Sequence, residues 1–185
     1  MNSLVPTPSR QTLRTGPVIS APDIGNAVLV RLRKAHRAEP TQLLRTREGR
    51  NLSRARYRRA EEFMSSLAPE APQDWHNFLY HAGIVAQLAL SSHLLDVGFS
   101  DVWCARHIGL NVARSLAYAN ATGFDYAGAE IKRLADVLSP YSKWNRRSLA
   151  DDPQPNDAGF TTEEVRILLR AMLGHVRNVT GHDPL

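Results

Sequence analysis

Seven arginines gather in one short segment of this chain and are its most distinctive chemical feature. A guanidinium group carries paired N–H donors whose geometry matches two oxygens of a phosphate group. If the segment is helical from about Leu44 onward, four of these arginines project from one side and can follow a phosphate backbone. Those four are Arg47, Arg50, Arg54 and Arg58. The candidate nucleic-acid-binding residues are Arg45, Arg47, Arg50, Arg54, Arg56, Arg58 and Arg59.

Two members of this cluster are out of register with the others. Arg56 and Arg59 fall near the apolar side of the expected helix, which carries Leu52 and Phe63. Each must therefore extend to solvent, pair with a carboxylate or hold an anion. The alternative for the whole cluster is a solvated face whose arginines pair with nearby glutamates and with the acidic second half of the chain. The sequence leaves both interpretations open.

A second candidate lies in the segment RNVTGH, where Arg177 and His182 stand five positions apart. This segment resembles the Arg-x4-6-His signature of HEPN domains, small helical bundles that often act as ribonucleases. Asn178 fits the polar residue that commonly follows the arginine in that family. The resemblance implies that Arg177 binds phosphate and that His182 acts as general acid or base, in a composite site across a dimer.

The histidines and the single cysteine do not predict a metal site. His76 and His81 share one expected helix, but a five-residue step places them about 140° apart. No two histidines have the three- or four-residue spacing that converges two imidazoles on one ion. Cys104 excludes a disulfide within one chain, and its neighbours predict a small core residue. We therefore expect no metal and no cofactor.

Residues 101–119 invite comparison with a helix-turn-helix motif. Gly109 falls at the turn position, but Ser115 occupies a place where a branched apolar residue should anchor the second helix. An apolar stripe from Val102 to Ala119 also runs across the glycine, which predicts one unbroken helix. A recognition helix here would carry Arg114 as its single base-reading cation. We therefore expect no DNA-reading motif in this stretch.

The elements that position these residues are all helical. Residues 1–22 contain four prolines and no periodicity, which predicts a flexible basic arm. Apolar residues then recur at helical spacing, and no segment has the alternation of a strand. The expected helices cover about 23–38, 53–67, 73–97, 101–122, 126–138 and 161–176. We predict an all-α bundle of about six helices in one domain over 23–185, with a basic helical part at 23–68 and an apolar core at 73–185.

Charge and hydropathy limit the possible locations and partners. The 185-residue chain has a net charge of +5, and residues 1–71 hold 13 basic against 6 acidic side chains. Such asymmetry predicts an anionic partner for the first half. The longest apolar stretch, Gly83–Leu90, spans eight residues, whereas a membrane helix needs about 20. The first residues also lack the apolar segment of a signal peptide, so we expect a cytoplasmic protein.

Together these patterns favour a non-enzymatic helical protein that binds nucleic acid or a nucleoprotein through its arginine-rich first half. Phosphate contacts of this kind imply little base specificity. An adaptor or assembly subunit that binds an acidic protein surface is the main alternative, and a HEPN-like ribonuclease is the second. The apolar helices of the second half also predict self-association.

Overall fold

The computed structural model describes residues 23–67, 75–139 and 157–183, which form seven α-helices and no strand. The all-α class predicted from the sequence is therefore confirmed. The helices are α1 (Asp23–Ala35), α2 (Arg47–Ser66), α3 (Trp75–Val97), α4 (Asp101–His107), α5 (Val112–Ala121), α6 (Ala129–Leu138) and α7 (Thr162–Thr180). Their buried apolar side chains form one core cluster that runs from Leu29 in α1 to Val176 in α7.

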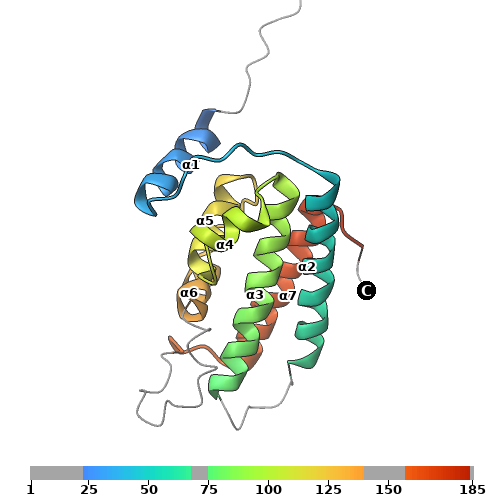
Figure 1. The fold of residues 1–185 in the computed structure, drawn as a ribbon. Helices are drawn as coiled ribbons and strands as arrows, with labels where there is room; N and C mark the ends of the chain where they lie inside the picture. The colour runs from blue at the N-terminus through green and yellow to red at the C-terminus, as the bar shows by residue number, and fades with distance from the viewer. Residues whose placement is uncertain (1–22, 68–74, 140–156, 184–185) are drawn as a thin grey trace, which may run out of the picture.

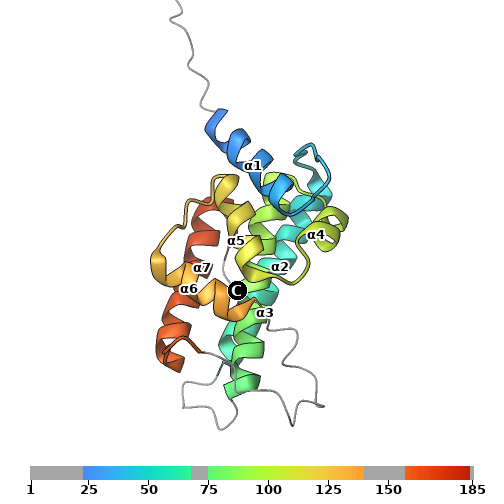
Figure 2. The same cartoon turned by 90° about the vertical axis from the view of Figure 1, so that its left-hand side faces the viewer.

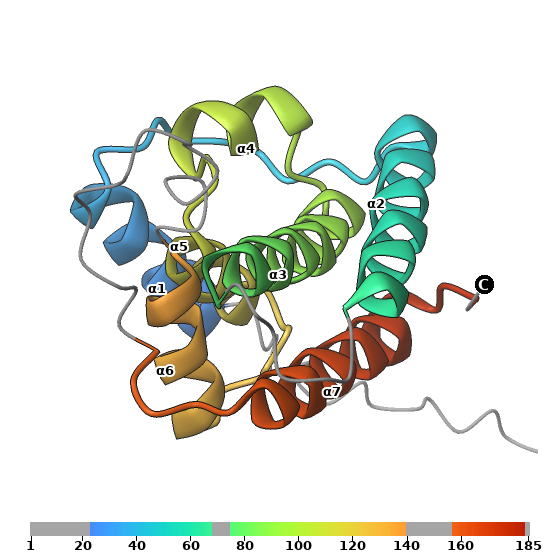
Figure 3. The ribbon, with the colours of Figure 1, turned by 90° about the horizontal axis from the view of Figure 1, so that it is seen from below.

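The central element is α3, which is surrounded by the other helices when the bundle is seen from below (Figure 3). It is apolar almost all round, so a single helix contacts neighbours on every side. Leu79, Ala86 and Leu90 are completely buried. By length and composition, α3 is long and apolar enough to cross a membrane. The core helix of a soluble protein meets the same criteria, and 67% of the most apolar 18-residue window of α3 is buried inside the protein. The eight-residue run counted in the sequence is shorter than the apolar part of α3. Polar residues interrupt that part of the helix, but nearly all of them are uncharged, so its mean hydropathy stays high.

Helix α2 begins at Arg47 and therefore contains six of the seven clustered arginines. Thr46 caps it, since its side-chain oxygen accepts a 2.9 Å hydrogen bond from the Gly49 N–H. The buried residues Ser53, Tyr57, Ala60 and Met64 recur every three or four positions and face α3 and α7. The start expected from the sequence, near residue 53, is too late, because the first turns are exposed and polar and lack an apolar period.

The predicted single helix over residues 101–119 is wrong. Helix α4 ends at His107, and Gly109 adopts a left-handed φ of +62°. Asn111 then caps α5 by accepting a 2.8 Å hydrogen bond from the Arg114 N–H. A glycine that turns the chain and a new capping residue together overrode the continuous apolar stripe. The break does not create a DNA-reading helix, because α5 packs against α1, α3 and α6 and none of its side chains is exposed.

Several helix ends follow the local signals in the sequence. Ser100 caps α4, and Thr161 and Glu164 form the predicted capping box at the start of α7. Helix α1 lies at one end of the bundle against α5 (Figure 2). The connection from α1 to α2, residues 36–46, crosses that end of the bundle (Figure 1). It is held there by a 3.1 Å hydrogen bond from the Trp103 indole N–H to the Glu39 carbonyl.

Candidate nucleic-acid interface

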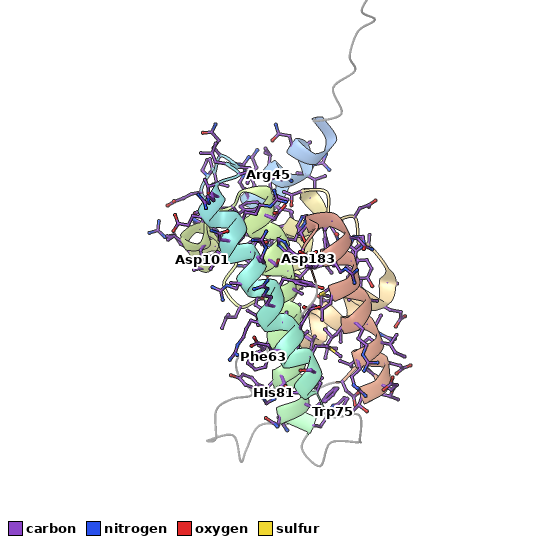
Figure 4. All side chains as sticks on the ribbon, turned by 90° about the vertical axis from the view of Figure 1, so that its right-hand side faces the viewer. Arg45, Phe63, Trp75, His81, Asp101 and Asp183 are labelled. Carbon is purple, nitrogen blue, oxygen red and sulfur yellow. The ribbon has the colours of Figure 1, made fainter. Side chains whose placement is uncertain are left out.

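The arginines of α2 divide between two flanks of the helix. One side of the helix carries Arg47, Arg54 and Arg58, which are separated by seven and four residues. This side faces toward α7, because Arg47 lines a hollow together with two residues of α7. Arg56 lies on the other flank, beside α4. Figure 4 shows Asp101 of α4 and Asp183, which follows α7, on opposite sides of α2. Interleaved positions along one helix therefore supply two different surfaces.

The arginines on the α4 side are neutralised by carboxylates. Arg56 pairs with Asp101 at 3.4 Å, and Arg59 pairs with Glu62 at 2.6 Å. The Arg59 guanidinium also lies over the Phe63 ring, 4.8 Å from its centroid. Of the fates expected for these two residues, pairing with a carboxylate is therefore the one the structure shows. Each of these guanidinium groups has a carboxylate partner within hydrogen-bond distance, so this flank has less uncompensated charge to offer a ligand.

Arg45 and Arg50 share one carboxylate at the start of α2. The Arg45 Nη2 and Arg50 Nε atoms each lie 3.8 Å from an oxygen of Asp96, near the end of α3. The Asp96 side chain is 9% exposed, whereas those of Arg45 and Arg50 are 73% and 62% exposed. A separation of 3.8 Å is an ion pair but exceeds hydrogen-bond length. Both guanidinium groups therefore keep donors for another anion.

The side chains of three further arginines, Arg47, Arg54 and Arg58, are exposed. Among residues 23–67, 75–139 and 157–183, no carboxylate oxygen lies within 4.0 Å of their guanidinium nitrogens. From Arg47 to Arg58 the helix advances about 16 Å along its axis. With Arg50 between them, these residues form a line that we call the arginine stripe: Arg47, Arg50, Arg54 and Arg58.

A hollow of about 450 Å³ adjoins the N-terminal end of this stripe, at Arg47 and Arg50. The N-terminal end of α2, the last turn of α3 and the last turn of α7 surround it. Its lining combines three guanidinium groups with one carboxylate and two side chains of α7. The lining residues are Arg45, Thr46, Arg47, Arg50, Asp96, Val179 and Thr180.

The structure separates the two residues of the HEPN-like segment. Arg177 is exposed on α7, whereas His182 is 2% exposed and follows the left-handed Gly181, whose φ is +69°. The His182 Nε2 atom lies 2.7 Å from the Ser53 hydroxyl, which also donates a 2.7 Å hydrogen bond to the Ser92 carbonyl. Burial is the main cause that lowers the pKa of His182. In this arrangement the imidazole fixes the end of α7 between α2 and α3 and does not reach a solvent-borne phosphodiester.

Three polar residues of this region were not expected from the sequence. Ser53, Ser92 and Asp96 are all buried, and each makes a contact with a residue far away in the chain. The available signal was their position: Ser53 interrupts the apolar face of α2, and Asp96 is an acidic residue within the most apolar helix. A polar residue on a buried face needs a partner, which is a reason to flag it.

The remaining candidates do not form a reactive centre in the described residues. In these segments no group of three histidine, cysteine, aspartate or glutamate side chains could hold a metal ion. Cys104 is 8% exposed, as predicted for a core residue. Burial raises the pKa of its thiol to about 12, which suppresses the reactive thiolate.

Comparison with known proteins adds no relative: no family model, curated protein or solved structure matches this chain.

Proposed function

We propose that this protein binds nucleic acid without catalysing a reaction, by contacting phosphate groups with the arginine stripe of α2. The observation that carries the proposal is the line of exposed arginines in which Arg47, Arg54 and Arg58 have no carboxylate partner among the described residues. Unpaired guanidinium groups on a rigid helix are preorganised donors for phosphate oxygens.

The dimensions of the stripe suit a nucleic-acid strand. The stripe is about 16 Å long, which corresponds to about five nucleotides at a rise of about 3.4 Å per nucleotide along one strand of a duplex. Arg54 and Arg58 lie one helical turn apart, so neighbouring guanidinium groups can contact successive phosphates. Side chains of this kind position a protein on the backbone and read no bases, so we expect similar affinity for unrelated sequences.

The surrounding charge supports the same assignment. The described residues 23–67 contain eleven arginine and lysine side chains against five aspartate and glutamate side chains, a net charge of +6. A positive potential of this size raises the rate at which a polyanion is encountered and makes association sensitive to salt. The arm over residues 1–22, with Arg10 and Arg14, lies outside the described residues.

An adaptor that binds an acidic protein is a second candidate, supported by a different observation. Three large apolar side chains are exposed near α4: Val102 at 73%, Leu44 at 58% and Leu110 at 54%. They border two adjoining hollows of about 410 and 260 Å³ that share Asp101. Exposed apolar residues beside charged ones are typical of a protein interface. In that case these apolar side chains would form part of the interface, and the exposed arginines of α2 would meet the acidic surface of the partner.

Equilibrium binding separates the two candidates. Fluorescence anisotropy with labelled duplex DNA, single-stranded DNA and RNA, at low and near-physiological salt, should show binding that weakens steeply as salt rises. If no labelled nucleic acid binds even at low salt, the nucleic-acid proposal is wrong. The adaptor candidate then becomes the better explanation.

The ribonuclease alternative has its own test. The HEPN resemblance predicts RNA cleavage that disappears in His182→Ala, whereas the contact between His182 and Ser53 predicts loss of stability and no cleavage by either protein. The measurement is incubation of labelled RNA with both proteins, after circular dichroism has shown that the variant is folded. The cytoplasmic location and the self-association expected from the sequence stay predictions.

A further inference from the structure

We infer that the hollow at the start of α2 holds a phosphate monoester, and that the end of a nucleic-acid strand supplies it. This inference rests on the proposed function. It specifies which part of the nucleic acid binds at the N-terminal end of the stripe, next to Arg47 and Arg50. The relevant residues are the three arginines of the hollow, Arg45, Arg47 and Arg50, and the carboxylate of Asp96.

The construction of the hollow resembles a preorganised anion site. Asp96 is nearly buried and attracts Arg45 and Arg50 from opposite oxygens at 3.8 Å, which holds both guanidinium groups at the rim. Because neither contact is a hydrogen bond and both side chains are exposed, each guanidinium group keeps N–H donors for an anion. Arg47 adds a third guanidinium group, for which no carboxylate lies within 4.0 Å among the described residues.

Charge decides which phosphate fits. Three guanidinium groups and one carboxylate leave a side-chain charge of +2 around the hollow. A phosphate monoester carries about −1.5 to −2 near pH 7, whereas an internal phosphodiester carries about −1. The start of α2 adds about +0.5, and the C-terminal ends of α3 and α7, which border the same space, add about −0.5 each, so the net charge around the hollow is about +1.5. The monoester is therefore the better match.

The position of the hollow identifies the source of the monoester. Arg47 and Arg50 belong both to the hollow and to the arginine stripe, so a ligand here is continuous with the line toward Arg54 and Arg58. A strand whose terminal phosphate occupies the hollow would place its following phosphates beside these two arginines. A volume of about 450 Å³ also lies within the usual range for small-ligand sites.

The test uses one labelled oligonucleotide in three forms, with a 5′-phosphate, with a 3′-phosphate or with neither. We expect one phosphorylated form to bind about tenfold more tightly than the unphosphorylated form, the gain typical of one added charge-assisted hydrogen bond. Arg45→Gln should reduce that preference to about threefold or less, because Arg45 lines the hollow and lies outside the stripe. Arg59→Gln, which removes one charge from the other flank of α2, should retain the full preference.

A second arm identifies free phosphate as the source. Inorganic phosphate replaces chloride at constant ionic strength while the melting temperature is followed. A rise in the wild-type protein that is absent from Arg45→Gln, with no preference among the oligonucleotides, would keep the monoester site but contradict the strand end as its source. The site itself is overturned if the three oligonucleotides bind equally and phosphate does not raise the melting temperature. Failure of the proposed function looks different, because then the unphosphorylated oligonucleotide does not bind at low salt.

Discussion

The backbone N–H of Leu44 donates a 3.1 Å hydrogen bond to the carbonyl of Gly98, and this contact joins the segment before α2 to the end of α3. Gly98 has a φ of +110°, and a Cβ atom there would lie 2.6 Å from the Leu44 nitrogen. Both the left-handed backbone and the close approach require glycine. Arg45 follows Leu44 and lies 3.8 Å from Asp96, two residues before Gly98, so the fold of the hollow depends on this contact.

Replacing Gly98 with alanine should lower the free energy of unfolding by about 2 kcal/mol or more, because it adds both backbone strain and a collision with Leu44. Urea unfolding followed by circular dichroism measures the change. Gly174→Ala is the matched control: Gly174 lies within α7 with no atom near its missing Cβ, so alanine should stabilise by about 0.5–1 kcal/mol. Equal stability of the two variants would contradict the close backbone contact between Leu44 and Gly98.

Stability should fall as the solution becomes acidic. His93 is 3% exposed and packs against Phe124, and burial, which outweighs the nearby Asp96 carboxylate, lowers its pKa from 6.5 to about 4. Between these two values the unfolded chain binds a proton that the folded chain does not, so unfolding is favoured as the pH falls. We expect a loss of about 2 kcal/mol between pH 7 and pH 5, to which the lowered pKa of His182 adds in the same direction.

Urea unfolding at several pH values tests this dependence. In His93→Gln the decline over the same interval should be smaller, because a group that titrates in the unfolded chain has been removed. A wild-type protein that is equally stable at pH 7 and pH 5 would show that His93 and His182 do not have lowered pKa values.

The Cys104 thiol should be unreactive in the folded protein. It is 8% exposed and its pKa is raised to about 12, so the thiolate is scarce at neutral pH. Labelling with a thiol reagent should therefore be slower by orders of magnitude in buffer than in denaturant. Rapid labelling of the folded chain would place Cys104 at the surface and contradict the packing of α4.

The sequence predicted what depends on local patterns and missed what depends on distant contacts. Helical periodicity and capping residues such as Ser100 and Thr161 act within one turn, so the helical class and several helix ends could be predicted. The break at Gly109 was missed because an apolar stripe says where side chains are buried and not whether the backbone is continuous.

The candidate site was predictable in its residue types and not in its geometry. Helical spacing predicted the line from Arg47 to Arg58. Pairing with a carboxylate was one of the three possibilities predicted for Arg56, and it is the one the structure shows. The contact of Ser53 with His182 joins residues 129 positions apart, and the pairing of Arg50 with Asp96 joins two helices. No local pattern encodes which distant side chain fills such a position, so these contacts required the three-dimensional structure.

The central claim is that one flank of α2 contacts phosphates, and two matched double variants test it most directly. Arg54→Gln with Arg58→Gln removes two charges from the stripe, whereas Arg56→Gln with Arg59→Gln removes two from the α4 side at interleaved positions. Each pair changes the net charge equally, and the ion pairs that the second variant breaks on the α4 side are surface interactions of small energy.

The measurement is the slope of log affinity against log salt concentration for a labelled duplex. We predict that the stripe variant reduces the slope by about 1.8, which is about 0.9 for each phosphate that an arginine no longer neutralises, while the variant of the α4 side retains the wild-type slope. Equal reductions in both variants, or none in either, would contradict a phosphate-binding surface on this flank of α2.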